Sequence, residues 1–368
     1  MNVQVRGAKS AEGAQRLGVI DCDIHPVMRS PGDLKKYLSP KWHDHLDTYG
    51  SFHRQPFVQG DIYPRAAPYL SRRDAMPPNG GPPGSDLEFM RAQLLDLHNI
   101  EVGVLQVLGG GTHQRNIDYG AAICSAINNW QVAEWISHDE RLRGSISITQ
   151  EYPEAAVAEI RKHGPDKRFV QIGMNQRSLE PAGRRRYWPI YEAAVEFDLS
   201  LGIHTGGYNG HAPVPGGGWP SYYAEQHHLI NVCQQNVLSS MVMEGVFEQF
   251  PTLRVVLVEG GFTWAPALTW RLDKLWKKLR SEVPRLTRPP SDYIRQHIWF
   301  TTQPVDDMGS PERLREICDL VGWDRLCFSS DYPHWDFDDP RYAFTFRLSE
   351  SEKLAIFNRN ARQAYNLQ

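Results

Sequence analysis

The sequence contains no long hydrophobic run: no apolar stretch approaches the roughly 18 residues that a membrane-spanning helix needs. It also lacks a positively charged start followed by an apolar segment, which an export signal would require. Residues 1–16 are small and polar, and we expect them to form a flexible leader. These absences predict a cytoplasmic protein without a membrane partner.

Paired cysteines and an excess of basic charge are missing as well. The five cysteines are scattered, odd in number and never spaced as CxxC, a usage typical of reduced thiols in a cytosolic protein. They are Cys22, Cys124, Cys233, Cys318 and Cys327. The net charge of −3 gives no sign of the basic face that nucleic-acid binding normally requires. We therefore expect a small-molecule substrate and no nucleic-acid partner.

What the chain does contain is a regular alternation of apolar strands and helices. Strands are predicted to begin near residues 19, 102, 142, 169, 199, 253, 298 and 326, and a long helix is expected over 222–250. Several strands are continuous apolar runs, as expected when both faces of a parallel sheet are covered. Such a sheet is closed most economically as a (β/α)8 TIM barrel, with residues 17–368 as a single domain. An open doubly wound sheet is the alternative, but no G-x-G-x-x-G follows the first strand.

Two irregular segments are candidates for substrate contact. Residues 51–85, a long insertion after the first strand, are rich in proline and glycine and should form an extended loop; Arg54 lies near its beginning. Residues 205–220 are glycine-rich and carry aromatic residues such as Tyr208, which suits a lid over a flat, apolar ligand. Trp264 and Trp335 follow other strand ends and are further candidates for lining the pocket.

The first strand turns acidic at its end. Asp23 and His25 are two residues apart, and side chains at that spacing on a strand point to the same side. A carboxylate beside an imidazole at a strand end is half of a divalent metal site. The alternative is an aspartate that orients a histidine by a hydrogen bond, without any metal. The metal interpretation needs further ligands elsewhere in the chain.

Other predicted strands end in residues of the same kind. His204 ends the fifth strand, Glu259 the sixth and Asp331 the eighth, and His334 follows three residues later. In a TIM barrel the carboxyl ends of the strands meet at one face, where catalytic residues lie. Imidazoles and carboxylates that converge there are hard to sustain without a cation. Each residue taken singly is equally consistent with a hydrogen-bonded strand end.

With these strand-end residues, the sequence resembles the amidohydrolase superfamily, in the branch of aminocarboxymuconate-semialdehyde decarboxylase and γ-resorcylate decarboxylase. The resemblance covers nearly the whole chain from Val19 onward. It includes Phe-Pro-Thr-Leu-Arg-Val-Val at residues 250–256, Ser-Asp-Tyr-Pro-His at 330–334, and Asn-Arg-Asn-Ala-Arg-Gln-Ala-Tyr at 358–365. Each motif is short, but their order and spacing together are specific.

The resemblance implies a set of metal ligands. The family's first-strand H-x-H falls on Asp23 and His25, its strand-five histidine on His204 and its strand-eight aspartate on Asp331. The histidine that handles protons beside the metal is replaced by Glu259. No lysine ends the fourth strand, so we expect one divalent ion and not a carbamate-bridged pair. The mixed nitrogen and oxygen donors suit Zn or Mn, with Fe, Co or Ni as alternatives.

The sequence leaves the reaction open. Three carboxylates would outweigh the charge of one divalent ion, which favours hydrolysis, with metal-activated water attacking a small aromatic or cyclic substrate. In that hypothesis Asp331, Glu259 and His334 are the catalytic acids and bases. The alternative is a non-oxidative decarboxylase of an aromatic acid, in which a protonated Glu259 supplies the proton. Two non-enzyme alternatives are a barrel that only binds a ligand and a structural partner with residues 51–85 as an oligomer arm. Since related barrels pair, we also expect a homodimer.

Overall fold

A computed structural model describes residues 17–50, 70–108, 110–207, 218 and 220–368. Its centre is a sheet of eight parallel strands that pair in sequence order. The strands are β1 (Val19–Ile24), β2 (Ile100–Leu105), β3 (Leu142–Ser147), β4 (Phe169–Arg177), β5 (Ser200–Gly207), β6 (Val255–Leu257), β7 (Ile298–Thr301) and β8 (Leu326–Cys327). The predicted (β/α)8 TIM barrel is confirmed, whereas residues 51–69 of the predicted loop insertion lie outside the described residues.

The barrel closes where β1 meets the segment that follows β8. The amide of Cys22 donates to the carbonyl of Phe328 at 3.0 Å, and the amide of His25 donates to that of Tyr332 at 2.8 Å. The amide of Asp331 donates in turn to the carbonyl of Asp23 at 3.2 Å. The first and last strands are therefore joined at the level of the polar strand ends, although they lie about three hundred residues apart in the chain.

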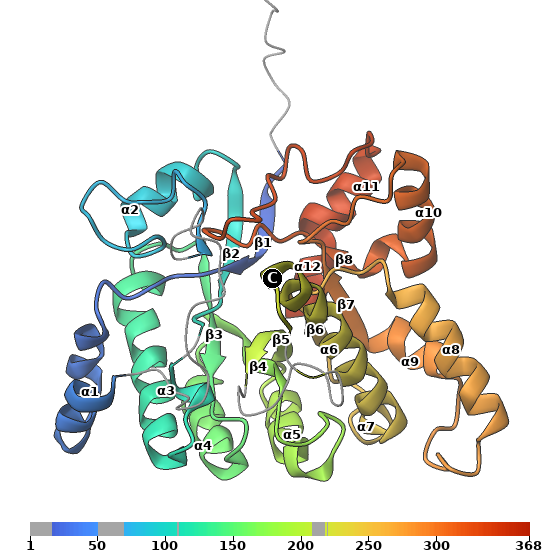
Figure 1. Cartoon of the computed structure of the whole chain (residues 1–368), viewed down its shortest axis with the longest axis horizontal. Helices are drawn as coiled ribbons and strands as arrows, with labels where there is room; N and C mark the ends of the chain where they lie inside the picture. Colours follow the sequence, from blue (N-terminus) through green and yellow to red (C-terminus); the bar gives the residue numbers. More distant parts are fainter. Residues whose placement is uncertain (1–16, 51–69, 109, 208–217, 219) are drawn as a thin grey trace, which may run out of the picture.

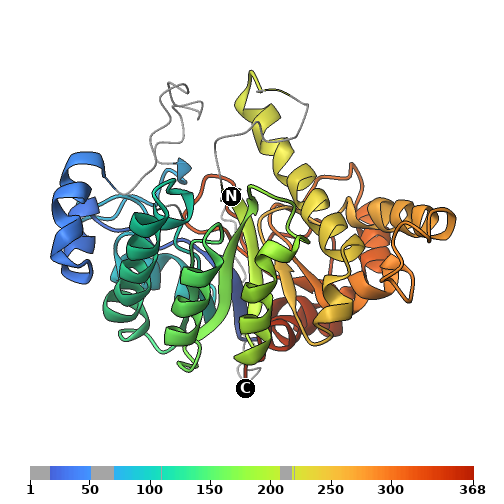
Figure 2. The ribbon, with the colours of Figure 1, turned by 90° about the horizontal axis from the view of Figure 1, so that it is seen from below.

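Helices surround the sheet (Figures 1 and 2). They are α1 (His43–Tyr49), α2 (Leu87–Met90), α3 (Ile117–Gln131), α4 (Pro153–His163), α5 (Trp188–Glu196), α6 (Tyr223–Met243), α7 (Val246–Gln249), α8 (Ala265–Lys278), α9 (Pro290–His297), α10 (Pro311–Val321), α11 (Glu350–Leu354) and α12 (Asn360–Tyr365). In Figure 2 the first half of α6, drawn in yellow, extends beyond the body of the barrel. Because helices cover the outer face of the sheet and apolar side chains fill its inner face, the strands are buried on both faces. This explains why their sequences are continuous apolar runs.

The prediction of one long helix over 222–250 is wrong. The helix ends at Met243, and a separate short helix, α7, begins at Val246. Between them Gly245 has φ of 75°, a left-handed backbone that ends a helix and that glycine adopts without steric cost. The sequence pattern continues through this point because both helices pack apolar residues against the same core.

Side chains that point into the barrel form a core of their own. It contains Ile20, Cys22, Val102, Val104, Val170, Val256, Val258, Trp299 and Cys327, together with Ala361, Ala364 and Tyr365 from α12. The closing helix therefore covers the amino-terminal end of the strands and seals it. All five cysteines are buried as free thiols. With this end filled by apolar groups, polar chemistry is confined to the opposite, carboxyl end.

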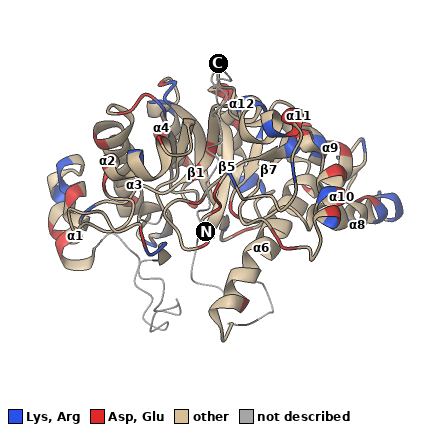
Figure 3. Cartoon of the chain, turned by 90° about the horizontal axis from the view of Figure 1, so that it is seen from above, with Lys and Arg blue, Asp and Glu red and all other residues tan. Residues whose placement is uncertain are grey.

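Charge is distributed over the outer helices. Lys and Arg lie beside Asp and Glu on α8, α9 and α10 in the view of Figure 3, in line with the small net charge. Acidic residues also occur at the centre of the barrel in this view. Among the described helices, none has both the length and the apolar character to cross a membrane.

Candidate metal centre

Five of the residues predicted from strand ends meet at the carboxyl end of the barrel. Asp23 lies on β1 and His25 follows it; His204 lies on β5; Glu259 follows β6 and Asp331 follows β8. All five are buried, with at most 6% of their surface exposed. The structure therefore brings together residues as far apart in the chain as Asp23 and Asp331, as the barrel topology requires.

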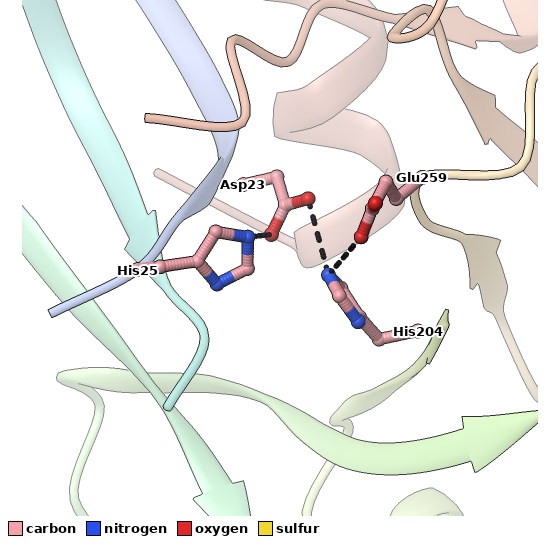
Figure 4. A group of neighbouring side chains, drawn as sticks. All are labelled: Asp23, His25, His204 and Glu259. Atoms are coloured by element: carbon pink, nitrogen blue, oxygen red, sulfur yellow. Dashed lines mark ion pairs between the residues drawn. The ribbon is translucent and has the colours of Figure 1, made fainter. Parts of the chain in front are cut away.

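Four of them form a compact set, the primary cluster: Asp23, His25, His204 and Glu259 (Figure 4). One ligand-type atom from each lies within 4.8 Å of all the others. The two oxygens of Asp23 lie 3.3 Å from His25 Nε2 and 3.4 Å from His204 Nε2. Glu259 Oε2 lies 3.0 Å from His204 Nε2. These separations are those of atoms that share one small cation.

Backbone carbonyls orient both imidazoles of the primary cluster. His25 Nδ1 lies 2.8 Å from the carbonyl oxygen of Gln106, and His204 Nδ1 lies 2.8 Å from that of Thr205. A carbonyl only accepts, so Nδ1 carries the hydrogen in each ring and Nε2 is left with a lone pair when the ring is neutral. Both Nε2 atoms face the interior of the cluster (Figure 4). This arrangement is the usual support of a metal-binding histidine.

The nitrogen and oxygen atoms that face one another in the primary cluster lack hydrogen bonds. Within the described part of the chain, no hydrogen bond satisfies either oxygen of Asp23, Nε2 of His25 or His204, or Oε2 of Glu259, although all are buried. Such a concentration of unsatisfied polar atoms is costly in a folded protein. Two imidazole nitrogens and carboxylate oxygens are suitable donors for Zn2+ or Mn2+. The donor set fits a divalent ion.

Asp331 adjoins the primary cluster and contacts His334. Its Oδ1 lies 2.9 Å from His25 Nε2 and 2.5 Å from His334 Nδ1. The rings of His25 and His334 stack with centroids 4.5 Å apart. Burial alone would raise the pKa of Asp331, but the neighbouring imidazoles of His334 and His25 lower it well below its usual range. Asp331 is therefore held as a carboxylate.

The pKa of Glu259 is shifted in the opposite direction, upwards. Burial, followed by the negative charge of Asp331, raises the pKa of Glu259 above its usual value, despite the opposing effect of His204. Glu259 and Asp331 both adopt a left-handed backbone conformation, with φ of 53° and 60° respectively. Residues other than glycine adopt this conformation at a cost of order 1–2 kcal/mol, and it concentrates at functional sites.

The imidazoles of the primary cluster respond to the carboxylates around them. Burial lowers the pKa of His204, but the charges of Asp23 and Glu259 outweigh it and raise the pKa to about 10. The pKa of His25 is likewise raised well above its usual value, mainly by Asp23. The carboxylates thus attract positive charge, which protons supply in the absence of another cation.

Sequence reasoning missed three polar residues at the mouth of the barrel. Gln303 follows β7, and its Nε2 donates to Asp331 Oδ2 at 3.2 Å and to Asp336 Oδ2 at 3.1 Å. His227, on α6, places Nε2 3.2 Å from Asp336 Oδ2. His227, Asp336 and Glu259 form a second group of ligand-type atoms within 4.8 Å of one another. Gln303 ends a strand and could have been found by the rule that found the others; His227 lies inside a helix without any such signal.

The predicted substrate-binding residues have different outcomes. Trp335 lies at the mouth: its indole donates to Tyr223 Oη at 2.9 Å, and its ring lies 5.6 Å from that of His227. Trp264 donates to the carbonyl of Gly260 at 2.9 Å and packs on Phe300, so its described contacts are structural. A further pair of candidates, Arg54 and Tyr208, lies outside the described residues, as does the leader over residues 1–16.

Comparison with known proteins adds to this geometry. A family model described as amidohydrolase matches residues 20–367. The γ-resorcylate decarboxylase of Polaromonas sp. strain JS666 is 25% identical over 305 residues, covering 77% of this chain and 88% of that protein. The γ-resorcylate decarboxylase of Rhodococcus jostii is 24% identical over 314 residues, with the same coverage. The resemblance drawn from the short motifs is confirmed.

A solved structure has the same fold. Dihydroxybenzoic acid decarboxylase from Polaromonas, determined with manganese and the inhibitor 2-nitroresorcinol, superimposes with a TM-score of 0.65 at 19% identity. The match covers 95% of this chain and 97% of that one. The whole described barrel, including the strand ends that carry the site, therefore follows a known architecture.

Proposed function

The chain belongs to the amidohydrolase family, and from that premise we propose that it is a metal-dependent decarboxylase of an aromatic acid. The observation that carries the proposal is the primary cluster, whose unsatisfied donors fit a divalent ion at the catalytic end of the barrel. The two relatives described above are γ-resorcylate decarboxylases, and the solved structure with the same fold is a dihydroxybenzoic acid decarboxylase. Their names favour the alternative drawn from the sequence over hydrolysis, which was the leading prediction.

The preference for hydrolysis came from an incomplete count of charge. It set Asp23, Glu259 and Asp331 against one divalent ion and left the histidines out. Burial and the charge of Asp331, however, raise the pKa of Glu259, and the charge of Asp23 raises the pKa values of His25 and His204, so bound protons offset part of the negative charge of the carboxyl groups. The site is consequently less negative than the sequence suggested, and an anionic aromatic acid is an acceptable substrate.

We assign Asp23, His25, His204 and Asp331 as the residues that hold the ion. A ligand must be deprotonated, and Asp331 is the carboxyl group whose pKa is lowered. Mn2+ is the ion of choice because it accepts a mixture of imidazole and carboxylate donors and is bound by a similar decarboxylase. When bound, the ion supplies a Lewis acid that orients and polarises the oxygens of the substrate.

Glu259 is then the proton donor. Two neighbouring carboxyl groups whose pKa values are pushed apart commonly divide into an acid and a permanent anion, and Glu259 is the one whose pKa is raised. In decarboxylation the bond between ring carbon and carboxyl carbon breaks, CO2 leaves, and the electron pair on the ring carbon takes the proton of Glu259. His334 holds Asp331 in place through the contact at 2.5 Å.

The experiment is a search for CO2 release across a panel of hydroxybenzoates that includes 2,6-dihydroxybenzoate. The protein is stripped of metal with a chelator and assayed before and after addition of Mn2+. We expect release of CO2 and of the matching phenol only after reloading. Cleavage of an ester or amide panel by the reloaded protein, without CO2 from any acid, would favour the hydrolase instead.

A further inference from the structure

A small recess adjoins the primary cluster on the side of β2 to β5. His204 belongs to the cluster and also lines the recess, so the two share a wall. The residues that follow β2, end β3 or lie on β4 form the rest of the lining, and its polar members and central glycine are Gln106, Thr112, Ser147, Gly173 and Asn175. The reaction described so far uses none of their side chains.

The strand register explains why there is space at this point. Ser147 pairs with Gly173, and Asn175 pairs with His204, on neighbouring parallel strands. Paired residues and residues two apart present their side chains to the same face of a sheet. Asn175 therefore points to the same side as His204, and Gly173 contributes no side chain between Asn175 and the core. The missing side chain leaves the recess open.

Gln106 brings a buried amide to the recess. It is 4% exposed, and within the described part of the chain its Nε2 has no hydrogen-bond partner. A Cβ atom added to Gly173 would lie 3.3 Å from Gln106 Oε1, so the amide lies against the glycine that opens the recess. A buried amide donor without an acceptor is costly, and a ligand that supplies an acceptor removes this cost.

The two amides of the recess are fixed relative to the metal site. The backbone amide of Gln106 donates to the carbonyl of Ile24 at 2.7 Å, and its carbonyl accepts from His25 Nδ1 at 2.8 Å. The backbone amide of Asn175 donates to Gln150 Oε1 at 2.8 Å, and Gln150 Nε2 donates to the carbonyl of Asn175 at 3.2 Å. A group held in the recess is therefore held in a defined position beside the metal ligands.

The lining and the size of the recess restrict what it takes. Apart from His204, no titratable side chain lines it in the described part of the chain, so a carboxylate would have no cationic partner there. Its volume is about 20 Å³, and one water molecule requires roughly 10–15 Å³. A carboxylate or a methoxy group is larger than this space. A single neutral hydroxyl group fits both the volume and the amide donor.

We propose that the recess is the subsite for one phenolic hydroxyl group of the substrate and that Gln106 selects for this group. The hydroxyl oxygen accepts a hydrogen bond from Gln106 Nε2 while the acid group of the same ring lies at the primary cluster. The inference rests on the proposed function, which supplies an aromatic acid as the substrate. It adds a specificity: an acid with a hydroxyl group at that ring position is preferred over the same acid with hydrogen or methoxy there.

The test compares the best hydroxybenzoate of the panel with the acids that lack one of its hydroxyl groups in turn. The readout is the ratio of kcat/KM for the full acid to that for each shortened acid, with Mn2+-loaded protein. Gln106→Leu keeps the size of the side chain and removes its hydrogen bond, so one of these ratios should fall about tenfold through loss of activity on the full acid.

Two further variants sharpen the test. Gly173→Ala should lower the same ratio, because the added methyl group occupies the recess; apart from Gln106 Oε1, its nearest neighbour lies 3.7 Å away, so the backbone can accept it. Gln176→Leu is the matched control. It removes an amide from β4 that bonds Thr205 Oγ1 and does not line the recess, so every ratio should stay as in the wild type. Metal content should be unchanged in all of these variants.

The other outcomes contradict the subsite. Ratios that are the same in Gln106→Leu and the wild type would overturn it and leave the decarboxylase proposal intact. An equal loss for the full and shortened acids would also overturn it, since Gln106 would then act only through His25. Gln106→Leu keeps the proposal testable if circular dichroism shows that Gly173→Ala does not fold.

A protein without decarboxylase activity still tests the subsite. If no acid releases CO2, the decarboxylase proposal falls, and titration calorimetry of the Mn2+-loaded protein with the same acids replaces the kinetics. A preference in binding for the full acid that Gln106→Leu removes would support the subsite. Equal affinities in the wild type, or no binding of any acid, would overturn it.

Discussion

Asp331 and Glu259 are both buried carboxyl groups at strand ends, yet their surroundings push their pKa values in opposite directions. His334 and His25 stabilise the anion of Asp331, whereas Glu259 is desolvated and faces the charge of Asp331. At the scale of the residue, this contrast divides the site into a group that holds the ion and a group that holds a proton.

The two carboxyl groups should therefore respond differently to the same chemical change. We expect Glu259→Gln to lower kcat by about 10²–10⁴-fold, the range typical for loss of a general acid, with the metal content unchanged. Asp331→Asn should lower the metal content itself, because an amide is a weaker ligand than a carboxylate. Elemental analysis and steady-state kinetics on the two variants provide the measurement. Loss of metal in Glu259→Gln and its retention in Asp331→Asn would reverse the assignment.

Metal affinity should also depend on pH. Without an ion the pKa of His204 is raised to about 10, and that of His25 is raised as well, so at neutral pH a metal ion must displace protons from both rings. The affinity for Mn2+ is therefore expected to rise with pH between about 6 and 8, with release of protons on binding. Titration calorimetry in buffers of different ionisation enthalpy measures both quantities. An affinity that is constant over this range, with no protons released, contradicts the expectation.

At the scale of the element, the site depends on how β1 meets the segment after β8. Asp21, fully buried, accepts hydrogen bonds from the amide of Ser330 at 2.9 Å, from its hydroxyl at 2.5 Å and from the amide of Asp23 at 3.2 Å. Burial raises the pKa of Asp21 to about 7. Asp23 lies two residues after Asp21, and Asp331 directly follows Ser330. These hydrogen bonds therefore position both residues. The carboxyl group of Asp21 therefore links β1 to the segment after β8 through hydrogen bonds.

Removing the carboxyl group of Asp21 should destabilise the protein. Asp21→Ala leaves the donors of Ser330 and Asp23 without an acceptor, and each buried unsatisfied donor costs about 1–3 kcal/mol. We expect a loss of at least about 3 kcal/mol in the free energy of unfolding, measured by urea denaturation of the metal-free protein. Asp44→Ala, at an exposed position of α1, is the control and should change the stability by less than about 0.5 kcal/mol. Equal stabilities for the two variants would show that Asp21 has no such role.

At the scale of the whole molecule, metal binding and folding should be coupled. The assigned ligands Asp23, His25, His204 and Asp331 come from β1, β5 and the segment after β8, so the metal site exists only in the folded barrel. An ion at a hundredfold excess over its Kd stabilises the folded state by about 2.7 kcal/mol. We expect chelation to lower the Tm by roughly 3–4 °C, and Asp23→Asn to abolish the difference. A Tm that does not respond to Mn2+ in the wild-type protein argues against the site.

Most of the barrel and of the primary cluster could be predicted from the sequence because one rule applies to both. Apolar runs that end in a polar residue mark the carboxyl ends of parallel strands, and the fold brings those ends together. The rule found Asp23, His25 and His204, and it applies equally to Gln303. It could not find His227 or Asp336, since a helix and a loop reach the site only through tertiary packing. The helix break at Gly245 was missed for a related reason: the apolar pattern is continuous across it. The predicted homodimer stays a prediction.

The most direct test of the account follows the carboxyl carbon of the substrate. The Mn2+-loaded protein is given 2,6-dihydroxybenzoate labelled with heavy carbon in the carboxyl group, in deuterated water. Decarboxylation through the primary cluster predicts labelled CO2 and resorcinol in equal amounts, with one deuterium on the ring carbon that carried the carboxyl group, and no product after chelation. Two results would contradict it. One is labelled CO2 that forms at the same rate without metal. The other is that the metal-bound protein leaves 2,6-dihydroxybenzoate and the other hydroxybenzoates unchanged.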